Sequence, residues 1–476
     1  MLCASAPEAP GRWLNGAVPR FLAAQPDARL IPLPWHLPLE QWPTDVLVAL
    51  PRGISRHVVR FIQVGSEVFA AKEVLEGSAM HEYRMLTDLN RLRAPAVEPS
   101  GVVSGRVDAH GSPLDSILLT RHLQFSLPYR SLFSTGVRRE TVSRLIDAMV
   151  VLLARLHLTG FLWGDVSLSN ILFRRDAGEF AAYLVDAETG ELHDTLSDGQ
   201  RLHDLDIAVV NLFGEFSDLR EGRLLDEQLD PLALVKQIET RYHDLWQELT
   251  GVEEFAGSEL SRIESRVRRL NNLGFDVAEL DIQTSPTGET IRIQPKVVDA
   301  GHHSRRLLRL TGLDTEENQA RRLLNDLDTY RVQHSLSHVE ESVAAHQWLM
   351  NAFVPVVTAI PPDLAGKREP AQIFHEVLDY RWYQSQRERR EVPLTEAVQG
   401  YIRDVLSALP DEVISSEMIS PLGETRQLVN PLDPSQGFVD EEDMPVDPWE
   451  AEAYAPGTEV LPDHLDIDAL RRRARS

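Results

Sequence analysis

The chain has 476 residues, a length that predicts two or three domains. Its 73 Asp and Glu residues outnumber its 48 Lys and Arg residues, so the net charge is −25. Such a chain would be repelled by nucleic-acid phosphates, and we expect no nucleic-acid partner. The single cysteine, Cys3, excludes a disulfide scaffold and cysteine-rich metal sites, while 43% hydrophobic residues can build sizeable cores.

Residues 1–43 are rich in Pro, Ala and Trp and show no sustained periodicity, so we expect an irregular N-terminal arm. The arm lacks the basic segment followed by a long apolar segment that marks a secretory signal peptide. No apolar stretch of the chain is long enough for a membrane span. We therefore expect a cytoplasmic protein.

Residues 44–123 predict one small lobe rich in β-structure. Alternating apolar residues indicate strands, and Gly65-Ser66 indicates a hairpin turn between two of them. A single helix is predicted by apolar residues spaced three and four apart. The predicted strands and helix are strand 45–50, strand 57–64, strand 67–75, helix 78–92, strand 101–107 and strand 115–121.

Residues 124–233 predict a second, more helical lobe. Its helix 140–158 is apolar on nearly every side, which is typical of a buried helix. Two short apolar strands, 170–173 and 181–187, and a helix over about 201–216 follow. Residues 234–405 are mostly helical with a hairpin-like pair of strands, and the Pro-rich tail 406–476, with 16 acidic residues between 411 and 470, predicts disorder.

Five polar residues occur in an order that indicates chemistry. Lys72 lies in a mostly apolar strand, although only four of the chain's basic residues are lysine. Glu82 follows ten residues later on the predicted helix. Asp165 and Asn170 have the spacing D-x-x-x-x-N, and Asp186 ends the next strand pair. Together they supply one ammonium group and several of the oxygen ligands that Mg²⁺ prefers.

Each of these residues alone also has an ordinary structural interpretation. Lys72 could extend its aliphatic stem along a strand edge, Glu82 could lie on a solvated helix face, and Asp186 could cap a turn. A D-x-x-x-x-N match by itself is expected by chance in a chain of this length. The joint order of the residues and elements is what favours a phosphate- and metal-binding site.

In this order the residues resemble the protein-kinase-like fold. Over about residues 44–400 the chain is similar to bacterial lipopolysaccharide-kinase-like proteins that carry a C-terminal domain of unknown function, the domain of unknown function 4032 family. The segment GHHSRRLLRLTGLDTEENQARRLLNDL, which begins at Gly301, is typical of that domain. The resemblance implies an α+β, two-lobed kinase-like fold, followed by a mostly helical C-terminal domain containing a β-hairpin and by an acidic tail.

The resemblance also implies ATP and Mg²⁺ as cofactors and phosphate transfer to a hydroxyl group. Gly53 is the one glycine left where kinases have a glycine-rich loop, which leaves two alternatives: its polar neighbours supply phosphate donors, or nucleotide binding is weak. The implied roles are catalysis for Asp165, as the base, and Lys72; cofactor binding for Lys72, Glu82, Gly53, Ser55, Arg56, Asn170 and Asp186; and metal binding for Asn170 and Asp186.

Four departures from the kinase pattern indicate a non-protein hydroxyl acceptor, such as a sugar or another small molecule. Trp163-Gly164 replaces the usual His-Arg, Ala187-Glu188 replaces Phe-Gly, and Ser167 replaces a phosphate-contacting lysine. Only about a dozen residues separate Asp186 from the next helix, so no peptide-docking segment is expected. Two alternatives remain open: a nucleotide-binding, pseudokinase-like regulatory or scaffold module, and an atypical kinase that transfers AMP.

Residues of lower rank complete the second lobe. His157 is interpreted as a buried structural histidine, and Asp206 is expected to accept hydrogen bonds from the catalytic-loop backbone. Glu188 could lie near the metal or in an exposed turn, with equal weight. Residues 121–123 are expected to form the hinge between the lobes.

The C-terminal domain contains a basic cluster around His302 and His303. Adjacent histidines point in different directions and no further ligand lies at metal-binding spacing, so a metal site is disfavoured. The cluster could bind an anion, but we favour a helix start in which Asp314 caps the helix and Glu317 reaches back to it. This domain is also a candidate surface for a protein partner.

Overall fold

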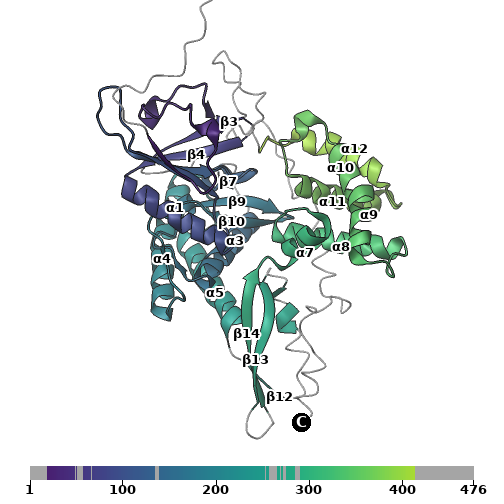
Figure 1. The fold of residues 1–476 in the computed structure, drawn as a ribbon. Coiled ribbons are helices and arrows are strands. Elements are labelled where there is room, and N and C mark those ends of the chain that lie inside the picture. The colour runs from purple at the N-terminus through teal and green to yellow at the C-terminus, as the bar shows by residue number, and fades with distance from the viewer. Residues whose placement is uncertain are drawn as a thin grey trace, which may run out of the picture.

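The structure is a computed structural model with three parts that follow one another along the chain (Figure 1). A sheet-rich N-terminal lobe is followed by a mixed lobe and then by a C-terminal region of helices with a three-stranded sheet, which confirms the expected α+β class. The structure describes residues 19–48, 50, 57–65, 67–133, 139–251, 253–256, 265–268, 270–271, 275–284 and 290–412. The expected tail lies outside the described residues from 413 onward.

The N-terminal lobe is built on a six-stranded sheet with the order β1-β5-β6-β4-β3-β2. Every described strand pair in it is antiparallel. Its strands are β1 (Arg20–Leu22), β2 (Leu47–Val48), β3 (Val58–Val64), β4 (Glu67–Val74), β5 (Pro99–Ser104) and β6 (Ser116–Arg121). Because successive side chains of a strand point to opposite faces, β4 directs Phe69 and Ala71 to one face and Lys72 and Val74 to the other.

The face of Phe69 is covered by part of the segment expected to be an irregular arm. Residues 28–42, with short helices η1 (Ala28–Leu30) and η2 (Leu39–Gln41), pack Trp35 and Trp42 against the sheet, and β1 adds a strand at its edge. Arg106 ties the segment down by donating to the backbone oxygen of Trp35 over 2.9 Å. The apolar residues of this segment show no regular spacing, so its packing against the sheet could not be predicted from the sequence.

The other face carries α1 (Glu76–Arg91), which buries Ala79, Tyr83 and Leu86 at helical spacing. The mixed lobe continues its core, because one cluster of buried residues extends from α1 to α5. This lobe contains sheet β10-β9-β7 and the pair β11-β8. Its elements are β7 (Ser126–Pro128), α2 (Tyr129–Phe133), α3 (Arg139–Leu158), β8 (Phe161–Leu162), η3 (Leu168–Asn170), β9 (Ile171–Asp176), β10 (Glu179–Leu184), β11 (Glu191–Leu192), α4 (Asp198–Glu221) and α5 (Pro231–Thr250).

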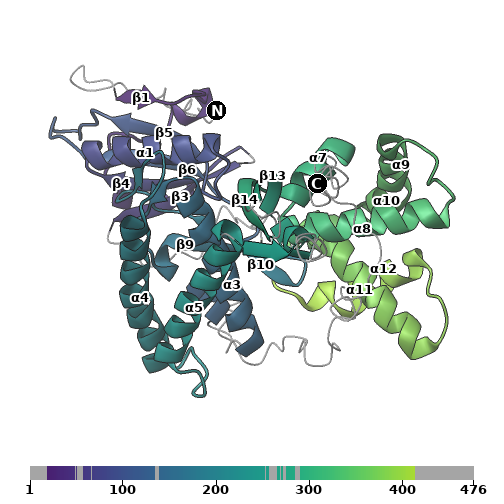
Figure 2. The same ribbon diagram turned by 90° about the horizontal axis from the view of Figure 1, so that it is seen from below.

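The C-terminal region has its own hydrophobic core, centred on Trp348, Phe374 and Tyr401. In the view from below, its helices lie to one side of the two lobes (Figure 2). The expected hairpin is present as β13 and β14, with β12 on its other edge. The elements are β12 (Glu253–Ala256), β13 (Phe275–Thr284), β14 (Thr290–Ala300), α7 (His302–Thr311), α8 (Glu317–Gln333), α9 (Glu341–Trp348), η4 (Leu349–Phe353), α10 (Val354–Thr358), η5 (Pro362–Leu364), α11 (Pro370–Glu388), α12 (Leu394–Asp404) and η6 (Leu406–Ala408).

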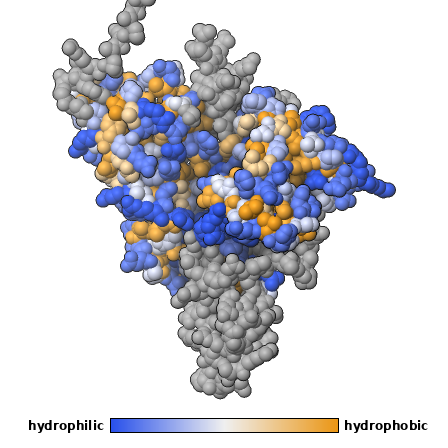
Figure 3. Space-filling view, turned by 45° about the vertical axis from the view of Figure 1, so that its right-hand side comes forward, coloured by the Kyte–Doolittle hydropathy of each residue, from blue (hydrophilic) through white to orange (hydrophobic). Residues whose placement is uncertain are grey.

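The surface of the described residues is mixed in polarity. On the face that Figure 3 shows, small hydrophobic patches lie among hydrophilic side chains. Among the described helices, none has the length and apolar character that crossing a membrane requires.

Candidate active site

Lys72 lies at the centre of a cluster of carboxylates. Its side chain is 11% exposed, and its Nζ donates to Glu82 Oε2 over 2.9 Å and to Asp186 Oδ2 over 2.7 Å. A third contact, to Glu188 Oε2, measures 3.2 Å. Burial alone would lower the pKa of Lys72, but the charges of Glu82 and Asp186 outweigh it and raise the pKa above its usual value. Lys72 is therefore an ammonium ion at any physiological pH.

Glu82 lies in the middle of α1, on the face that the helix buries, and is 1% exposed. Burial and the nearby charge of Asp186 raise the pKa of Glu82 to about 7, although Lys72 opposes the shift. Burial is the larger cause of this shift, and the negative charge of Asp186 adds to it because three carboxylates share one ammonium group.

Asp186 lies two residues after the end of β10 and is held by two contacts besides Lys72. Its Oδ1 accepts the backbone N–H of Glu188 over 3.0 Å, and its backbone oxygen accepts the indole N–H of Trp163 over 3.1 Å. These bonds fix both the carboxylate and the backbone that carries it. The structure thus brings Lys72, Glu82 and Asp186 together, as their order in the sequence predicted.

Two further residues join this cluster. Glu188 is 17% exposed at its side chain and bonds both Lys72 and, over 3.1 Å, the Nε2 of His57. Burial favours a higher pKa for Glu188, but the charge of Lys72 and the other contacts lower the pKa below its usual value. Glu188 was predicted to lie either near the metal or in an exposed turn; it lies in a turn, but its side chain faces Lys72 and is largely buried. His57 carried no pattern that sequence reasoning could use.

Asp165 and Asn170 lie on the loop between β8 and β9. The Asn170 side-chain amide donates to Asp165 Oδ2 over 3.1 Å and to the Asp165 backbone oxygen over 3.0 Å. Asn211 on α4 donates to the other carboxylate oxygen of Asp165 over 3.2 Å. Both oxygens of Asp165 are therefore oriented by hydrogen bonds from neutral amides.

The same loop is anchored by Asp204, not by Asp206. Asp204 is fully buried on α4 and accepts the backbone N–H groups of Trp163 over 2.8 Å and Gly164 over 2.7 Å. It also accepts from Nε2 of His157 over 3.1 Å. Asp206 is exposed, because two residues along a helix rotate a side chain by about 200°. The assignment of Asp206 was wrong.

His157 is a buried structural histidine, as expected. Its Nδ1 lies 2.6 Å from the Tyr242 hydroxyl, and burial lowers the pKa of His157, so the ring is neutral. The hydrogen-bond network assigns the proton to Nε2, which donates to Asp204 while Nδ1 accepts from Tyr242.

A further α4 residue, Glu215, holds the end of the loop. Its carboxylate accepts the backbone N–H of Leu168 over 2.6 Å and that of Ser169 over 3.0 Å. Asn211 and Glu215 lie one helical turn apart, so one edge of α4 holds the whole loop. Sequence reasoning missed both, because polar residues on a helix are usually solvated.

The connection between the lobes follows β6, where the hinge was expected. The backbone N–H of His122 donates to the Val68 oxygen over 2.9 Å, and the ring of His122 packs edge-on against Phe61. Burial lowers the pKa of His122 to about 4, so this histidine is neutral at pH 7. The remaining predicted phosphate donors, Gly53, Ser55 and Arg56, lie outside the described residues.

The basic cluster of the C-terminal region is arranged differently from the prediction. Helix α8 begins at Glu317, and Glu317 does not reach back to Asp314. Its carboxylate instead accepts the backbone N–H groups of His303 over 2.7 Å and Ser304 over 3.1 Å, at the start of α7. A side chain of this protein thus occupies the helix terminus at which an anion would bind.

The carboxylate cluster has the chemistry of a site for a hard cation. One oxygen each of Glu82, Asp186 and Glu188 lies within 4.8 Å of the other two. Asn170 and Asp186 flank the β9–β10 hairpin on opposite strands, and the Val185 N–H donates to the Asn170 backbone oxygen over 3.0 Å. Carboxylate and amide oxygens are the ligands that Mg²⁺ takes in proteins, so these residues fit such an ion.

Comparisons with known proteins give two findings. The family model described as "Domain of unknown function (DUF4032)" matches residues 244–406. This is the family expected for the C-terminal part of the chain. A solved structure titled "WaaP in complex with acyl carrier protein" is 16% identical and covers 48% of this chain and 99% of its own, with a TM-score of 0.29. No curated protein matches.

Proposed function

We propose that the protein is an ATP- and Mg²⁺-dependent phosphotransferase of kinase-like fold that acts on a hydroxyl of a non-protein acceptor. The observation that carries the proposal is the position of Lys72, whose ammonium group bonds both Glu82 on α1 and Asp186 after β10. A lysine held in this way between the two lobes can bind the phosphates of a nucleotide.

Lys72 contacts the α- and β-phosphates, and Glu82 keeps its side chain in place. The buried Glu82 carboxylate lies 2.9 Å from the ammonium group, so the lysine stays directed at Asp186 of the second lobe. Because the pKa of Lys72 is raised, its charge is always available to the nucleotide.

Asp186 and Asn170 hold the metal ion, and Glu188 lies close enough to Asp186 to contribute a further oxygen. The bound Mg²⁺ neutralises charge on the phosphates. The amide nitrogen of Asn170 is already engaged by Asp165, so its oxygen is the atom that faces a ligand. The indole of Trp163 keeps the backbone of Asp186 in register with the loop.

Asp165 acts as the base. The acceptor oxygen forms a bond to the γ-phosphorus while the bond from that phosphorus to the ADP oxygen breaks, and Asp165 takes the hydroxyl proton. Asn170 and Asn211 hold the two carboxylate oxygens without cancelling their charge, which keeps Asp165 able to accept a proton.

A non-protein acceptor is favoured by the short connection after Asp186. Only residues 187–197 separate it from α4, and they include β11, which pairs with β8 beside the loop. The Thr189 hydroxyl donates to the Trp163 backbone oxygen over 2.9 Å, so this connection packs on the catalytic loop. Binding of a protein partner through the C-terminal region stays a prediction.

Nucleotide titration and labelled turnover test this function. ATP with Mg²⁺ is titrated by calorimetry into the wild type, Lys72→Met and the matched control Lys236→Met, whose lysine is exposed on α5. We expect Lys72→Met to lose binding and the control to keep it. With ATP labelled at the γ-position and a panel of sugars and amino alcohols, Asp165→Asn should lower turnover about 100-fold or more.

Three other outcomes of these experiments would contradict the proposal in whole or in part. Absence of ATP binding by the wild type overturns it. Binding without turnover replaces the enzyme by a nucleotide-binding module, and transfer of an α-label replaces phosphate transfer by AMP transfer.

A further inference from the structure

The β9–β10 hairpin links the candidate active site to the C-terminal region. Its base carries Asn170 immediately before β9 and Asp186 two residues after β10. Its tip is a tight turn in which Ala177 and Gly178 have φ values of 53° and 89°. The six residues of β9 separate base and tip by about 20 Å.

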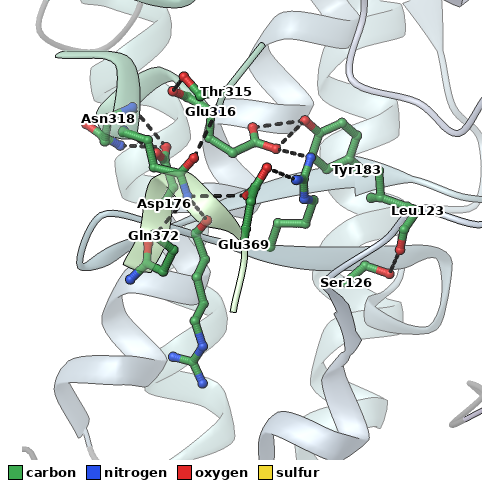
Figure 4. Close-up of polar contacts among 12 residues, drawn as sticks. Leu123, Ser126, Asp176, Tyr183, Thr315, Glu316, Asn318, Glu369 and Gln372 are labelled. Atoms are coloured by element: carbon green, nitrogen blue, oxygen red, sulfur yellow. Dashed lines mark hydrogen bonds and ion pairs between the residues drawn. The ribbon is translucent and has the colours of Figure 1, made fainter. Parts of the chain in front are cut away.

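The tip is bound by the first turn of α8. Asp176 is 3% exposed and accepts the backbone N–H groups of Gln319 over 2.7 Å and Asn318 over 3.1 Å, as well as the Asn318 side-chain amide over 2.9 Å (Figure 4). Asp176 thus caps a helix of the C-terminal region from another part of the chain. Gln372 on α11 accepts the backbone N–H of Ala177 over 3.0 Å.

The strands behind the tip are bound through Glu316. Arg174 on β9 bonds Glu316 and Glu369, each over 2.7 Å. The Tyr183 hydroxyl on β10 lies 2.7 Å and 2.9 Å from the two Glu316 oxygens. Figure 4 shows Tyr183 of the hairpin lying close to Glu316 and Glu369 of the C-terminal region. Both strands are therefore fixed by the same buried carboxylate.

These contacts are directional and largely buried. Glu316 is 8% exposed and Gln319 is fully buried. Loss of a hydrogen-bond partner on the hairpin or on the C-terminal region would therefore leave a buried polar group unsatisfied and lower the stability of the protein. Apolar surfaces can slide against each other, whereas hydrogen bonds to Asp176, Arg174 and Tyr183 permit one register only. The hairpin consequently has little freedom to tilt or shift.

We propose that the C-terminal region is a clamp that positions the metal-binding residues by holding the hairpin that carries them, from Asp176 at its tip to Tyr183 near its base. This inference rests on the proposed function of Asn170 and Asp186. Residues Asp176, Arg174, Tyr183 and Glu316 are positioning residues, since they act through the hairpin: Asp176 lies at its tip, Arg174 lies within β9, and Tyr183 lies near its base, opposite Leu172. The clamp assigns a role in catalysis to a region whose residues take no part in the Lys72 and Asn170 hydrogen bonds described above.

The test compares two tyrosine substitutions. Tyr183→Phe removes the hydroxyl that bonds Glu316. The control Tyr380→Phe removes a hydroxyl that donates to Asp404 over 2.6 Å within the C-terminal region, away from the hairpin. Asp176→Asn is a second, stronger variant of the clamp. Circular dichroism first establishes that each variant is folded.

Hydrogen–deuterium exchange without nucleotide is the readout that does not depend on activity. We expect Tyr183→Phe to speed exchange of the Val185 N–H, which closes the base of the hairpin, about tenfold, with no change in Tyr380→Phe. Unchanged exchange in both folded clamp variants, Tyr183→Phe and Asp176→Asn, would overturn the clamp, whether or not the wild type turns over ATP.

The second readout concerns the metal. The Mg²⁺ concentration that gives half-maximal ATP turnover should rise about tenfold in Tyr183→Phe, because misplaced ligands weaken the site. A purely structural role would lower the melting temperature and leave this concentration unchanged, which would also overturn the clamp. If the wild type neither binds nor turns over ATP, the proposed function fails, and the exchange result still decides whether the clamp exists.

Discussion

Replacing Asp204 with asparagine tests how the catalytic loop is held. The two oxygens of Asp204 accept three hydrogen bonds, from the Trp163 and Gly164 backbones and from His157. Trp163 and His157 share Oδ2, and Gly164 bonds Oδ1. An asparagine has one accepting oxygen, so Asp204→Asn keeps two of these bonds at most and turns an NH₂ group toward the remaining donor.

The expected loss follows from the lost bond. A buried hydrogen bond to a charged acceptor is worth about 1.5–3 kcal/mol. For a domain of 150–250 residues, each kcal/mol lowers the melting temperature by roughly 2–4 °C, so Asp204→Asn should melt about 3–12 °C lower. Because Gly164 precedes Asp165, turnover should fall as well.

Asp206→Asn is the matched control on the same helix. Asp206 is exposed, and surface substitutions change the free energy of unfolding by about 0.5 kcal/mol or less. Thermal melts followed by circular dichroism compare both variants with the wild type. Equal decreases in melting temperature for the two variants would refute the anchoring of the loop by Asp204.

Two further predictions concern the carboxylate cluster. Since the pKa of Glu82 is about 7, the carboxyl is mostly protonated below pH 7 and ionised above it, so Mg²⁺–ATP affinity should rise with pH up to about 7, by as much as about tenfold per unit, and then level off. Calorimetry at several pH values measures this slope, and an unchanged slope in Glu82→Gln would contradict the assignment. Glu188→Gln should raise the Mg²⁺ concentration for half-maximal binding of ATP about tenfold, whereas Glu191→Gln, which alters a side chain that is 65% exposed, should not. Equal effects of the two would exclude Glu188 from the metal site.

The residues of the site that could be predicted were those fixed by local elements. Lys72 lies on a strand, Glu82 on a helix and Asp186 after a second strand pair. Because each of these elements is recognisable from the local sequence, the three residues could be assigned to the site without information on distant contacts. The spacing of apolar residues indicated each of these elements. The observed bounds of α1 and α3 accordingly differ from the predicted bounds by only a few residues.

The residues that could not be predicted depend on long-range packing. Asp204 and Asp206 lie on one helix, and only the side that packs against the loop distinguishes them. A capping box was predicted from Asp314 and Glu317 alone, but the carboxylate of Asp176, more than 100 positions away, accepts the backbone N–H groups of Asn318 and Gln319 at that helix start. Local capping rules do not include a competitor from another domain.

The charge balance of the cluster favours a ligand-binding role over a structural one. A structural ion pair for Lys72 needs only one carboxylate. Burying further carboxylates beside it has a desolvation cost and does not add to the stability of that pair. Glu82, Asp186 and Glu188 nevertheless surround one ammonium group, and repulsion by Asp186 and Glu188 adds to burial in raising the pKa of Glu82. A divalent cation would relieve that repulsion, and it would do so only at the spacing that the hairpin maintains. A site with such excess charge therefore requires a rigid support, which the buried contacts of Asp176 with α8 can provide.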